Sequence, residues 1–375
     1  MTLGMVLVVI VIALAFNYIN GFHDTANSIA TVVATKVLTP GKAVILAAVT
    51  NLLGALWGTA VAKTIASGLI DSGLVGIGAE LLIGALLGAI VWNLITWWLG
   101  LPSSSSHALV GGLCGAAVAA AGNNMDAIIW AEDASHWWAG KGVIPKVIVP
   151  MVLSPMFGFI IAYVFMGMLF ALLAWFAERK GFLRRFGRTP FANAFFGKAQ
   201  IVSASAMGLS HGLNDAQKTM GIIALALAGA TVAGQLDGLP HWLHFMRIEE
   251  DAQGGFDIPV WIKVVCALVM ALGTASGGWR IIKTLGHKMV KLHPINGFAA
   301  ESSSAAVIIA CSHFGLPVST THNVSAAIMG VGAAKRFNAI RWTIVERMVW
   351  SWILTLPITA LVAYVLVKLM HGLYV

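Results

Sequence analysis

The stretch Gly21-Phe22-His23-Asp24-Thr25-Ala26-Asn27-Ser28 places charged and amide side chains inside a strongly apolar segment. Apolar runs at residues 3–19 and 29–34 flank it on both sides. A charged side chain at membrane depth costs about 2.5 to 3.5 kcal/mol on insertion scales, so such residues face a pathway or a partner rather than lipid. We therefore expect this segment to be a polar-interrupted membrane helix whose Asp24 points into a bundle.

A second stretch, Gly212-Leu213-Asn214-Asp215-Ala216-Gln217-Lys218-Thr219, repeats this pattern in the other half of the chain, again between apolar runs. Asp215 takes the place of Asp24, and Lys218 aligns with Asn27. One intramembrane aspartate could be accidental, but two in matching positions indicate a shared function.

The composition is that of a membrane protein. The chain has 375 residues, of which 59% are hydrophobic and 10% charged, with a mean hydropathy of +0.86. Soluble domains are about 25% charged, and an outer-membrane barrel would instead show alternating segments of about 10 residues. We predict an all-α polytopic membrane protein. The net charge of +8 is then explained by basic cytoplasmic loops, so no nucleic-acid partner is expected.

Several chemistries find no support in the sequence. The three cysteines, Cys114, Cys266 and Cys311, lie in apolar segments and show neither a disulfide framework nor metal-type spacing. The pair His23 and Asp24 does not match a zinc-binding helix face, and no nucleophile elbow or nucleotide-binding loop is present. We therefore expect no enzyme and no resident cofactor, and a secondary transporter rather than an ATP-driven pump.

The order of segments indicates two related halves. Each half consists of a polar-interrupted (broken) helix, a span, a broken hairpin and a span, giving five segments per half and about ten in all. The hairpins cover residues 81–121 and 298–334, the spans cover 43–62, 147–177, 259–279 and 342–370, and the second polar helix covers 199–230. An odd number per half predicts two inverted repeats, residues 1–177 and 199–375, joined by a basic linker at 178–198. Such repeats place substrate at their midplane interface.

Flanking charges support the opposite orientation of the two hairpins. Glu80 and Asp126 flank the first hairpin, whereas Lys291 and Lys335 flank the second. Lys291 belongs to a basic run at 280–293 that we expect to be a loop. The strongest basic cluster lies in the linker, which the positive-inside rule places in the cytoplasm. We expect a multi-pass protein of the cell (inner) membrane.

The two hairpin breaks have nearly the same sequence, Gly100-Leu-Pro-Ser-Ser-Ser-Ser-His107 and Gly315-Leu-Pro-Val-Ser-Thr-Thr-His322. Proline suits the first turn of a helix, serine and threonine cap it, and a helix N-terminus attracts anions. Two such tips would surround a small oxyanion with hydroxyl and amide donors. The alternative is that the hydroxyl groups only cap the tips. The candidate anion ligands are Ser103, Ser104, Ser105, Ser106, Ser319, Thr320 and Thr321.

The two aspartates need a positive partner inside the membrane. They can hold sodium or a divalent metal ion beside the anion, or carry a coupled proton; the alternative is a buried structural pair with Lys218. His23 and Asn214 adjoin the two aspartates and join them as coupling candidates. His107, His322, Ser28 and Thr219 are further candidates, whereas hydrogen-bonded packing is the expectation for His211 and His313.

At these four motifs the sequence resembles the inorganic phosphate transporter (Pit/PiT) family, over nearly the whole chain and in the right order. The resemblance is to the bacterial low-affinity, proton-coupled branch, and it implies that neutral metal–phosphate is carried. It implies that phosphate is bound at the hairpin tips, with the Asp motifs nearby; we add Asn27 and Lys218 as phosphate ligands. We also expect a homodimer.

Two departures bear on ion coupling. Sodium-coupled relatives tend to carry Asn-Asp-x-Ala-Asn in both halves, whereas this chain has His23 before Asp24 and Lys218 where the second copy would end in asparagine. An ammonium near Asp215 could replace a bound sodium ion. We predict proton symport in which Asp24, Asp215 or His23 titrates. Sodium-coupled phosphate transport, or transport of sulfate or another tetrahedral anion, are the alternatives.

Overall fold

The computed structural model describes residues 2–71, 73–76, 78–132, 140–248 and 257–373. Over these residues the chain is helical, without a strand; one isolated bridge joins Ile70 and Ile128. The prediction of an all-α protein is confirmed.

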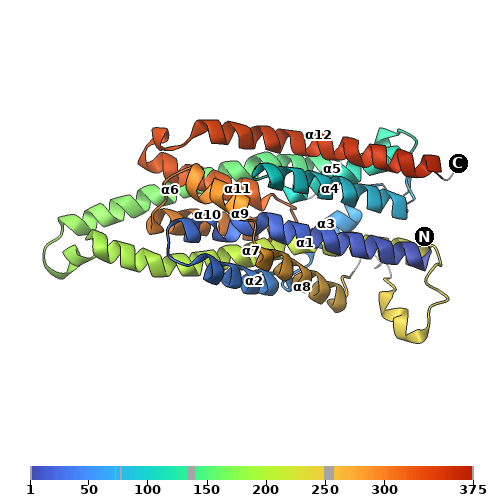
Figure 1. Ribbon diagram of the computed structural model, residues 1–375, viewed down its shortest axis with the longest axis horizontal. Helices are drawn as coiled ribbons and strands as arrows, with labels where there is room; N and C mark the ends of the chain where they lie inside the picture. Colours follow the sequence, from blue (N-terminus) through green and yellow to red (C-terminus); the bar gives the residue numbers. More distant parts are fainter. Residues whose placement is uncertain (1, 72, 77, 133–139, 249–256, 374–375) are drawn as a thin grey trace.

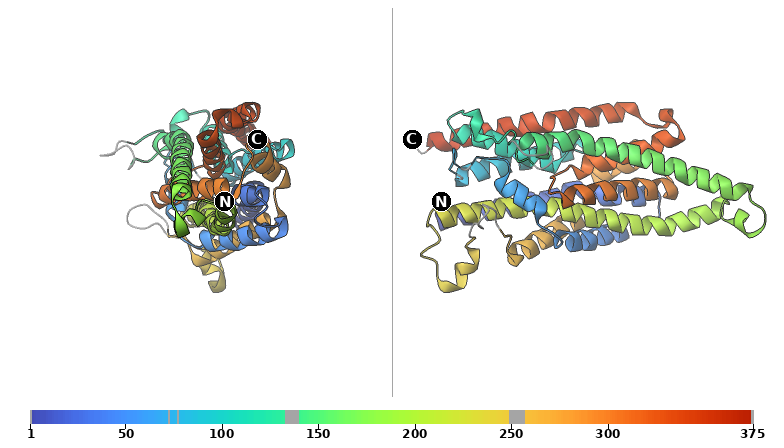
Figure 2. Two further views of the ribbon diagram at one scale, coloured as in Figure 1. Left: turned by 90° about the vertical axis from the view of Figure 1, so that its left-hand side faces the viewer. Right: turned by 180° about the vertical axis from the view of Figure 1, so that it is seen from behind.

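Twelve α-helices form the described chain. In chain order they are α1 (Leu3–Ala34), α2 (Pro40–Ala55), α3 (Ala60–Ser67), α4 (Ala79–Leu99), α5 (Ser105–Ala120), α6 (Val149–Glu178), α7 (Thr189–Val232), α8 (Val260–Ser276), α9 (Trp279–Lys283), α10 (Pro294–His313), α11 (Thr320–Lys335) and α12 (Trp342–Leu373). Most run along the long axis of the molecule, and both ends of the chain lie at the same end of it (Figure 1). The α6–α7 turn projects beyond the rest of the bundle at the opposite end (Figure 2).

Several helices are long and apolar enough to cross a membrane. Four helical segments meet this condition alone: Leu3–Ala34, Ala79–Leu99, Ile144–Glu178 and Trp342–Gly372. Two bent helix pairs raise the number to up to 6 if each pair is counted as one span. The chain is therefore a multi-pass membrane protein, while ten segments remain a prediction.

The polar motifs do not interrupt their helices, contrary to our expectation. Asp24 lies within the continuous helix α1, and Asp215 lies within the 44-residue helix α7. Neither motif contains proline, and a helix satisfies its own backbone hydrogen bonds, so the polar side chains can bind neighbouring helices without a break. Helix α7 also begins at Thr189, which makes much of the predicted linker helical.

The breaks occur instead in the segments that we expected to be simple spans. Helices α2 and α3 meet at an angle of 69°, and α8 meets α9 and the π-helical turn after it at 58°. Gly58 and Gly277 lie at these bends with φ of +90° and +70°, which glycine adopts without steric cost. The helix α9 and the π-helical turn occupy much of 280–293, so the loop expected there is also corrected.

The two hairpins form as predicted. Helices α4 and α5 lie toward the end with the chain termini, α10 and α11 lie toward the opposite end, and their tips meet between the two (Figure 1). Gly100 and Gly315 end the first arm of each hairpin with the same φ of +66°. At the contact, Ser106 Oγ donates to the Val318 carbonyl at 3.2 Å, and the His107 and His322 rings lie 4.8 Å apart.

Glycines allow each motif helix to approach a helix from the other half of the chain. A Cβ at Gly212 of α7 would lie 2.1 Å from the Asn51 carbonyl oxygen of α2, and one at Gly21 of α1 would lie 2.4 Å from the Met270 carbonyl oxygen of α8. Both distances are shorter than real side chains tolerate. The close crossings fix the position of α1 and α7, and therefore of the two aspartates.

Candidate functional site

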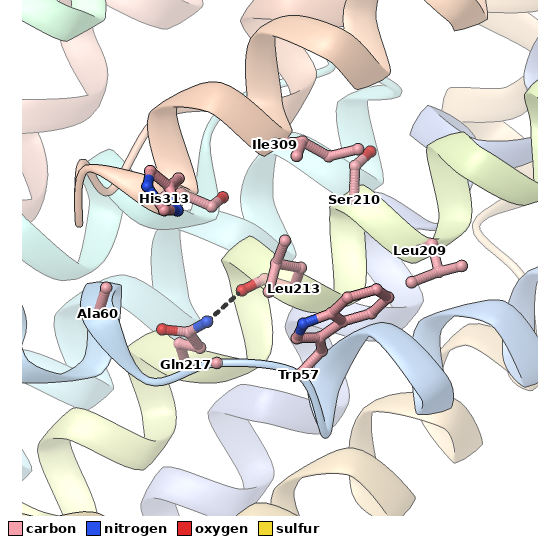
Figure 3. A pocket seen from close by; sticks show the side chains of 10 residues that line it. Trp57, Ala60, Leu209, Ser210, Leu213, Gln217, Ile309 and His313 are labelled. Carbon is pink, nitrogen blue, oxygen red and sulfur yellow. Dashed lines mark hydrogen bonds between the residues drawn. The ribbon is translucent and has the colours of Figure 1, made fainter.

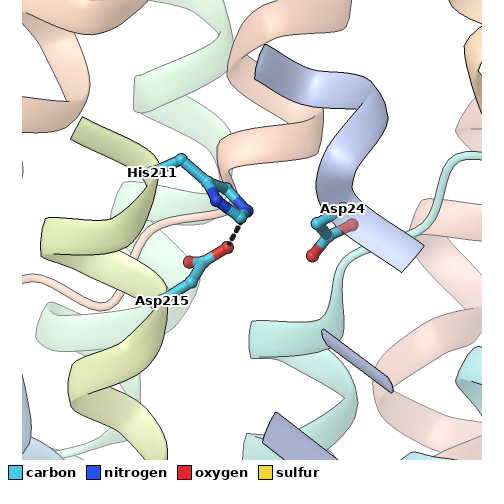
Figure 4. A group of neighbouring side chains, drawn as sticks. All are labelled: Asp24, His211 and Asp215. Carbon is cyan, nitrogen blue, oxygen red and sulfur yellow. Dashed lines mark ion pairs between the residues drawn. The ribbon is translucent and has the colours of Figure 1, made fainter. Parts of the chain in front are cut away.

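Helices α1 and α7 bring the two aspartates of the duplicated motif together. One ligand atom each from Asp24, His211 and Asp215 lies within 4.8 Å of the others (Figure 4). Asp24 has a relative exposure of 2% and Asp215 of 0%. The sequence prediction that the two motifs form a single buried site is consistent with this geometry.

Asp24 receives hydrogen bonds from both hairpins. Ser105 Oγ, in the first turn of α5, donates to its Oδ2 at 2.9 Å, and Thr321 Oγ1, in the first turn of α11, donates to its Oδ1 at 3.0 Å. His23 Nδ1 lies 2.9 Å from the same Oδ1, while its Nε2 lies 3.1 Å from Thr96 Oγ1 on α4. One carboxylate thus contacts both hairpin tips.

Asp215 has a different set of partners, which includes a full positive charge. Lys218 Nζ, one turn along α7, donates to its Oδ1. Thr320 Oγ1 donates to Oδ2 at 3.0 Å, and His211 Nε2 lies 3.0 Å from that same oxygen (Figure 4). Because Lys218 and Asp215 are both 0% exposed, the pair is desolvated, and the loss of one partner would leave an uncompensated charge.

Lys218 and Asn27, which occupy equivalent places in the two motifs, both reach the hairpin tips. The ammonium donates to Ser106 Oγ and, at 3.3 Å, to the Val318 carbonyl. Asn27 Nδ2 lies 3.1 Å from Thr320 Oγ1 and 2.9 Å from Thr321 Oγ1. The structure therefore brings these two candidates together with Ser105, Ser106, Thr320 and Thr321.

The other hydroxyl groups of the tips form hydrogen bonds within their own hairpins. Ser104 and Ser319 are the N-caps of α5 and α11, accepting from the backbone N–H of His107 at 3.2 Å and of His322 at 3.1 Å. Ser103 Oγ lies 2.8 Å from Thr96 Oγ1. The capping alternative thus holds for two of the seven candidates, and four face the aspartates and Lys218.

Several further candidates lie beside the site rather than in it. Asn214 Nδ2 donates to Ser312 Oγ at 2.8 Å and to the Leu316 carbonyl at 3.3 Å, so it anchors the second hairpin. The His322 ring stacks on Trp352 with centroids 4.2 Å apart and also contacts the His107 ring edge-on. Ser28 and Thr219 are buried, and their hydroxyls have no hydrogen-bond partner among the described residues.

The structure adds His211 to the site and shows a second unpredicted buried residue, Glu301, with partners of its own. His211 faces Asp215 and is held by Asn51 Oδ1, 3.1 Å from its Nδ1; its signal in the sequence was the i, i+4 spacing to Asp215, which places both on one helix face. Glu301 of α10 is 1% exposed and accepts hydrogen bonds from Thr31, Ser203 and Gln200. Nothing near Glu301 in the sequence indicated these partners.

A nearby cavity of about 360 Å³ does not contain the site. It lies where the α2–α3 bend meets α7 and α10, and its lining is mostly apolar (Figure 3). Gln217, the neighbour of Lys218, forms part of its wall and donates from Nε2 to the Leu213 carbonyl at 2.7 Å (Figure 3). Neither aspartate nor Lys218 is among the residues that line this cavity.

The arrangement can bind a small anion and a cation side by side. Four hydroxyl groups, an amide and an ammonium can donate to an oxyanion, while two carboxylates and an imidazole form a donor set suited to a cation. These groups are enclosed in a multi-pass helical bundle and contacted by the tips of both hairpins.

The chain belongs to the phosphate transporter family, whose model matches residues 20–363. The members of this family are transporters and not enzymes. The chain is 43% identical over 369 residues to a probable low-affinity inorganic phosphate transporter of Mycobacterium bovis, covering 98% of this chain and 78% of the relative. A protein of the same description from Bacillus subtilis is 41% identical over 354 residues, covering 94% and 93%.

A solved structure, described as the sodium-dependent phosphate transporter, has the same fold. The TM-score is 0.77 at 22% sequence identity, and the match covers 99% of this chain and 100% of the other. The likeness in fold therefore extends over the entire bundle.

Proposed function

We propose that this protein is a secondary active transporter that imports inorganic phosphate across the inner membrane of the cell. The observation that carries the proposal is that both motif aspartates, Lys218 and the tips of both hairpins form one buried cluster. The relatives named as phosphate transporters support phosphate as the substrate.

The donors at the tips suit a tetrahedral oxyanion. Phosphate would be held by the hydroxyl groups of Ser105, Ser106, Thr320 and Thr321, by Asn27 and by the ammonium of Lys218, at the positive ends of α5 and α11. The present hydrogen bonds of these hydroxyls to Asp24 and Asp215 would be exchanged for bonds to phosphate and to the coupled cation. Ser103, Ser104 and Ser319 would support the tips rather than bind directly.

We propose proton symport rather than sodium symport. The fixed ammonium of Lys218 already neutralises Asp215, so that half of the site does not need sodium. Asp24 has no lysine or arginine within 4.0 Å among the described residues, and His23 contacts it at 2.9 Å. The coupled proton would therefore be carried by Asp24 or His23, while Asp215 stays paired with its lysine.

A divalent metal ion travelling with phosphate fits the same site. Asp24, His211 and Asp215 provide oxygen and nitrogen ligand atoms of the kind that divalent metals accept. Metal–phosphate would be the cargo, and the ion would leave with the anion.

The symmetry of the site supports two inverted repeats. We propose that the protein has about ten segments and works by alternating access. We also propose that it forms a homodimer. The two tips share the same glycine conformation and the same type of cap, and each motif helix crosses a helix of the other half at a glycine. Such repeats exchange the roles of their halves as the site opens to either side.

Uptake of labelled phosphate into proteoliposomes, with pH and sodium gradients imposed separately, tests the proposal. We expect wild-type uptake to follow the pH gradient, to persist without sodium and to collapse with a protonophore, and Asp24→Asn to abolish it. Uptake that strictly requires sodium would refute proton symport, and saturating competition by sulfate would reassign the substrate.

A further inference from the structure

A basic cavity lies at the far end of α11 from the aspartates. Its volume is about 390 Å³. Because the lining residues of α11 run from Val331 to Lys335 and the helix rises about 1.5 Å per residue, the cavity lies about 17 to 22 Å from the hairpin tip at Thr320. Its lining consists of Val290, Lys291, Asn296, Val331, Gly332, Lys335, Arg336, Asn338 and Ala339.

The charge of this cavity is positive and uncompensated within the described chain. Lys291, Lys335 and Arg336 line it, and no carboxylate does. None of the three forms an ion pair within 4.0 Å with an acidic side chain of the described residues. Three like charges around one cavity repel one another, so an anion between them would be stabilised by all three.

The cavity also adjoins the start of a long helix, where Asn296 Nδ2 donates to Met166 Sδ at 3.6 Å. Asn296, which is 6% exposed, lies in the first turn of the 20-residue helix α10, and its Oδ1 accepts from the His293 backbone N–H at 3.0 Å. The positive end of the α10 dipole therefore adds to the field of the cations. Val290 and Val331 give the cavity an apolar wall.

The cavity lies toward one end of the helical bundle (Figure 1). Helix α11 ends here and α12 begins, at the end of the bundle that also carries the basic α6–α7 turn (Figure 1). Basic pockets between membrane helices at the cytoplasmic surface attract phosphate-bearing head groups.

We propose that this cavity is a second binding site for a phosphate-class anion, supplied either as the head group of an anionic phospholipid or as free orthophosphate. It is separate from the transport site, shares no residue with it and does not depend on the mode of coupling. An anion bound here would tie the start of α10 to the end of α11 and so fix the base of the second hairpin.

The test compares the wild type with the triple variant Lys291→Gln, Lys335→Gln, Arg336→Gln in lipid nanodiscs. The matched control, Lys180→Gln, Arg184→Gln, Arg185→Gln, removes the same number of exposed charges from the α6–α7 turn at the same end of the molecule. One arm titrates phosphatidylglycerol into phosphatidylcholine discs and follows bound lipid by native mass spectrometry. The other adds orthophosphate to pure phosphatidylcholine discs and follows thermal stability, with chloride at equal ionic strength as the reference.

We expect the cavity variant to bind at least tenfold more weakly in one arm, because each cation contributes about fivefold, or about 1 kcal/mol. The control should lose less than twofold. Loss in the lipid arm identifies the head group, and loss in the orthophosphate arm identifies the free anion. Orthophosphate at the transport site affects both variants alike and cancels in the comparison. Equal losses in the two variants, or no loss in either arm, would overturn the proposal.

Discussion

Lys218 lies one helical turn after Asp215 and donates to its carboxylate, so the second motif carries its own counter-charge into the membrane. The first motif has Asn27 in the equivalent position, and it donates to Thr320 and Thr321 instead. The two aspartates, similar in sequence, therefore differ in charge balance. This asymmetry makes Asp24 the candidate for ion coupling and Asp215 a fixed part of the site.

The Lys218→Asn variant should make the protein dependent on an external cation. Without the ammonium, Asp215 becomes an uncompensated buried charge, and the cost of breaking such a pair is about 3 to 5 kcal/mol. We expect a lower thermal midpoint in potassium or choline chloride and partial recovery in sodium chloride. Fluorescence-detected thermal unfolding in each salt measures both effects.

The double variant Asp215→Asn, Lys218→Met provides the control for that experiment. It removes both charges together, so it should be more stable than Lys218→Asn and indifferent to the choice of salt. If Lys218→Asn is as stable as the wild type in every salt, the ion pair does not have the role that we assign to it.

Asp24→Asn should abolish phosphate uptake while the protein stays folded. The amide oxygen can still accept from one hydroxyl, but the charged acceptor for Ser105, Thr321 and His23 is lost, and hydrogen bonds to a charged group contribute about 1.5 to 3 kcal/mol each. We expect at least a tenfold fall in uptake driven by a pH gradient. Size-exclusion chromatography in detergent checks folding, and undiminished uptake would exclude Asp24 from coupling.

Glu301 should show a large difference between two substitutions. In Glu301→Ala the donors Thr31, Ser203 and Gln200 lose their common acceptor inside the protein, at about 1 to 3 kcal/mol for each unsatisfied group. Glu301→Gln keeps one acceptor oxygen and the shape of the side chain, and should unfold several degrees above the alanine variant. Identical thermal midpoints would show that these hydrogen bonds contribute nothing to stability.

Gly212→Ala should separate α7 from α2 and displace Asp215. The added Cβ would lie 2.1 Å from the Asn51 carbonyl oxygen, and overpacking of this kind costs about 1 to 3 kcal/mol. Gly197→Ala is the matched control on the same helix, since the nearest atom to its Cβ lies 3.9 Å away, and alanine favours a helix by about 1 kcal/mol over glycine. We expect the thermal midpoint to fall in Gly212→Ala and to rise in Gly197→Ala. Phosphate uptake should be lost in Gly212→Ala alone.

The hairpins and the pairing of the motifs were predictable because their signals are local or duplicated. Proline followed by hydroxyl residues marks each helix start, as at Ser104 and Ser319, and the repeated Asp24 and Asp215 indicated one shared site. Which hydroxyl groups cap a helix and which bind an aspartate could not be predicted. Ser104 caps its helix while its neighbour Ser105 binds Asp24, a distinction that depends on how the helix is rotated against α1.

The incorrect expectations concern contacts between distant parts of the chain. We expected breaks at the polar motifs, but α1 remains continuous because its polar side chains find partners on other helices. The helix bends occur at Gly58 and Gly277, where a close neighbour and a positive φ, rather than polarity, decide the geometry. The hydrogen bonds of Glu301 could not be predicted because its partner Thr31 lies 270 residues away in the sequence.

The double attachment of Asp24 has a consequence for transport efficiency. Its carboxylate binds Ser105 of one hairpin and Thr321 of the other, so any motion that parts the two tips must first release one of these bonds. Under the coupling that we propose, the group that takes up the ion is also one of the groups that hold the two tips together. The Ser106–Val318 hydrogen bond and Lys218 also join the two tips, so the leak rate of an Asp24→Asn variant would measure the share of this closure that Asp24 provides.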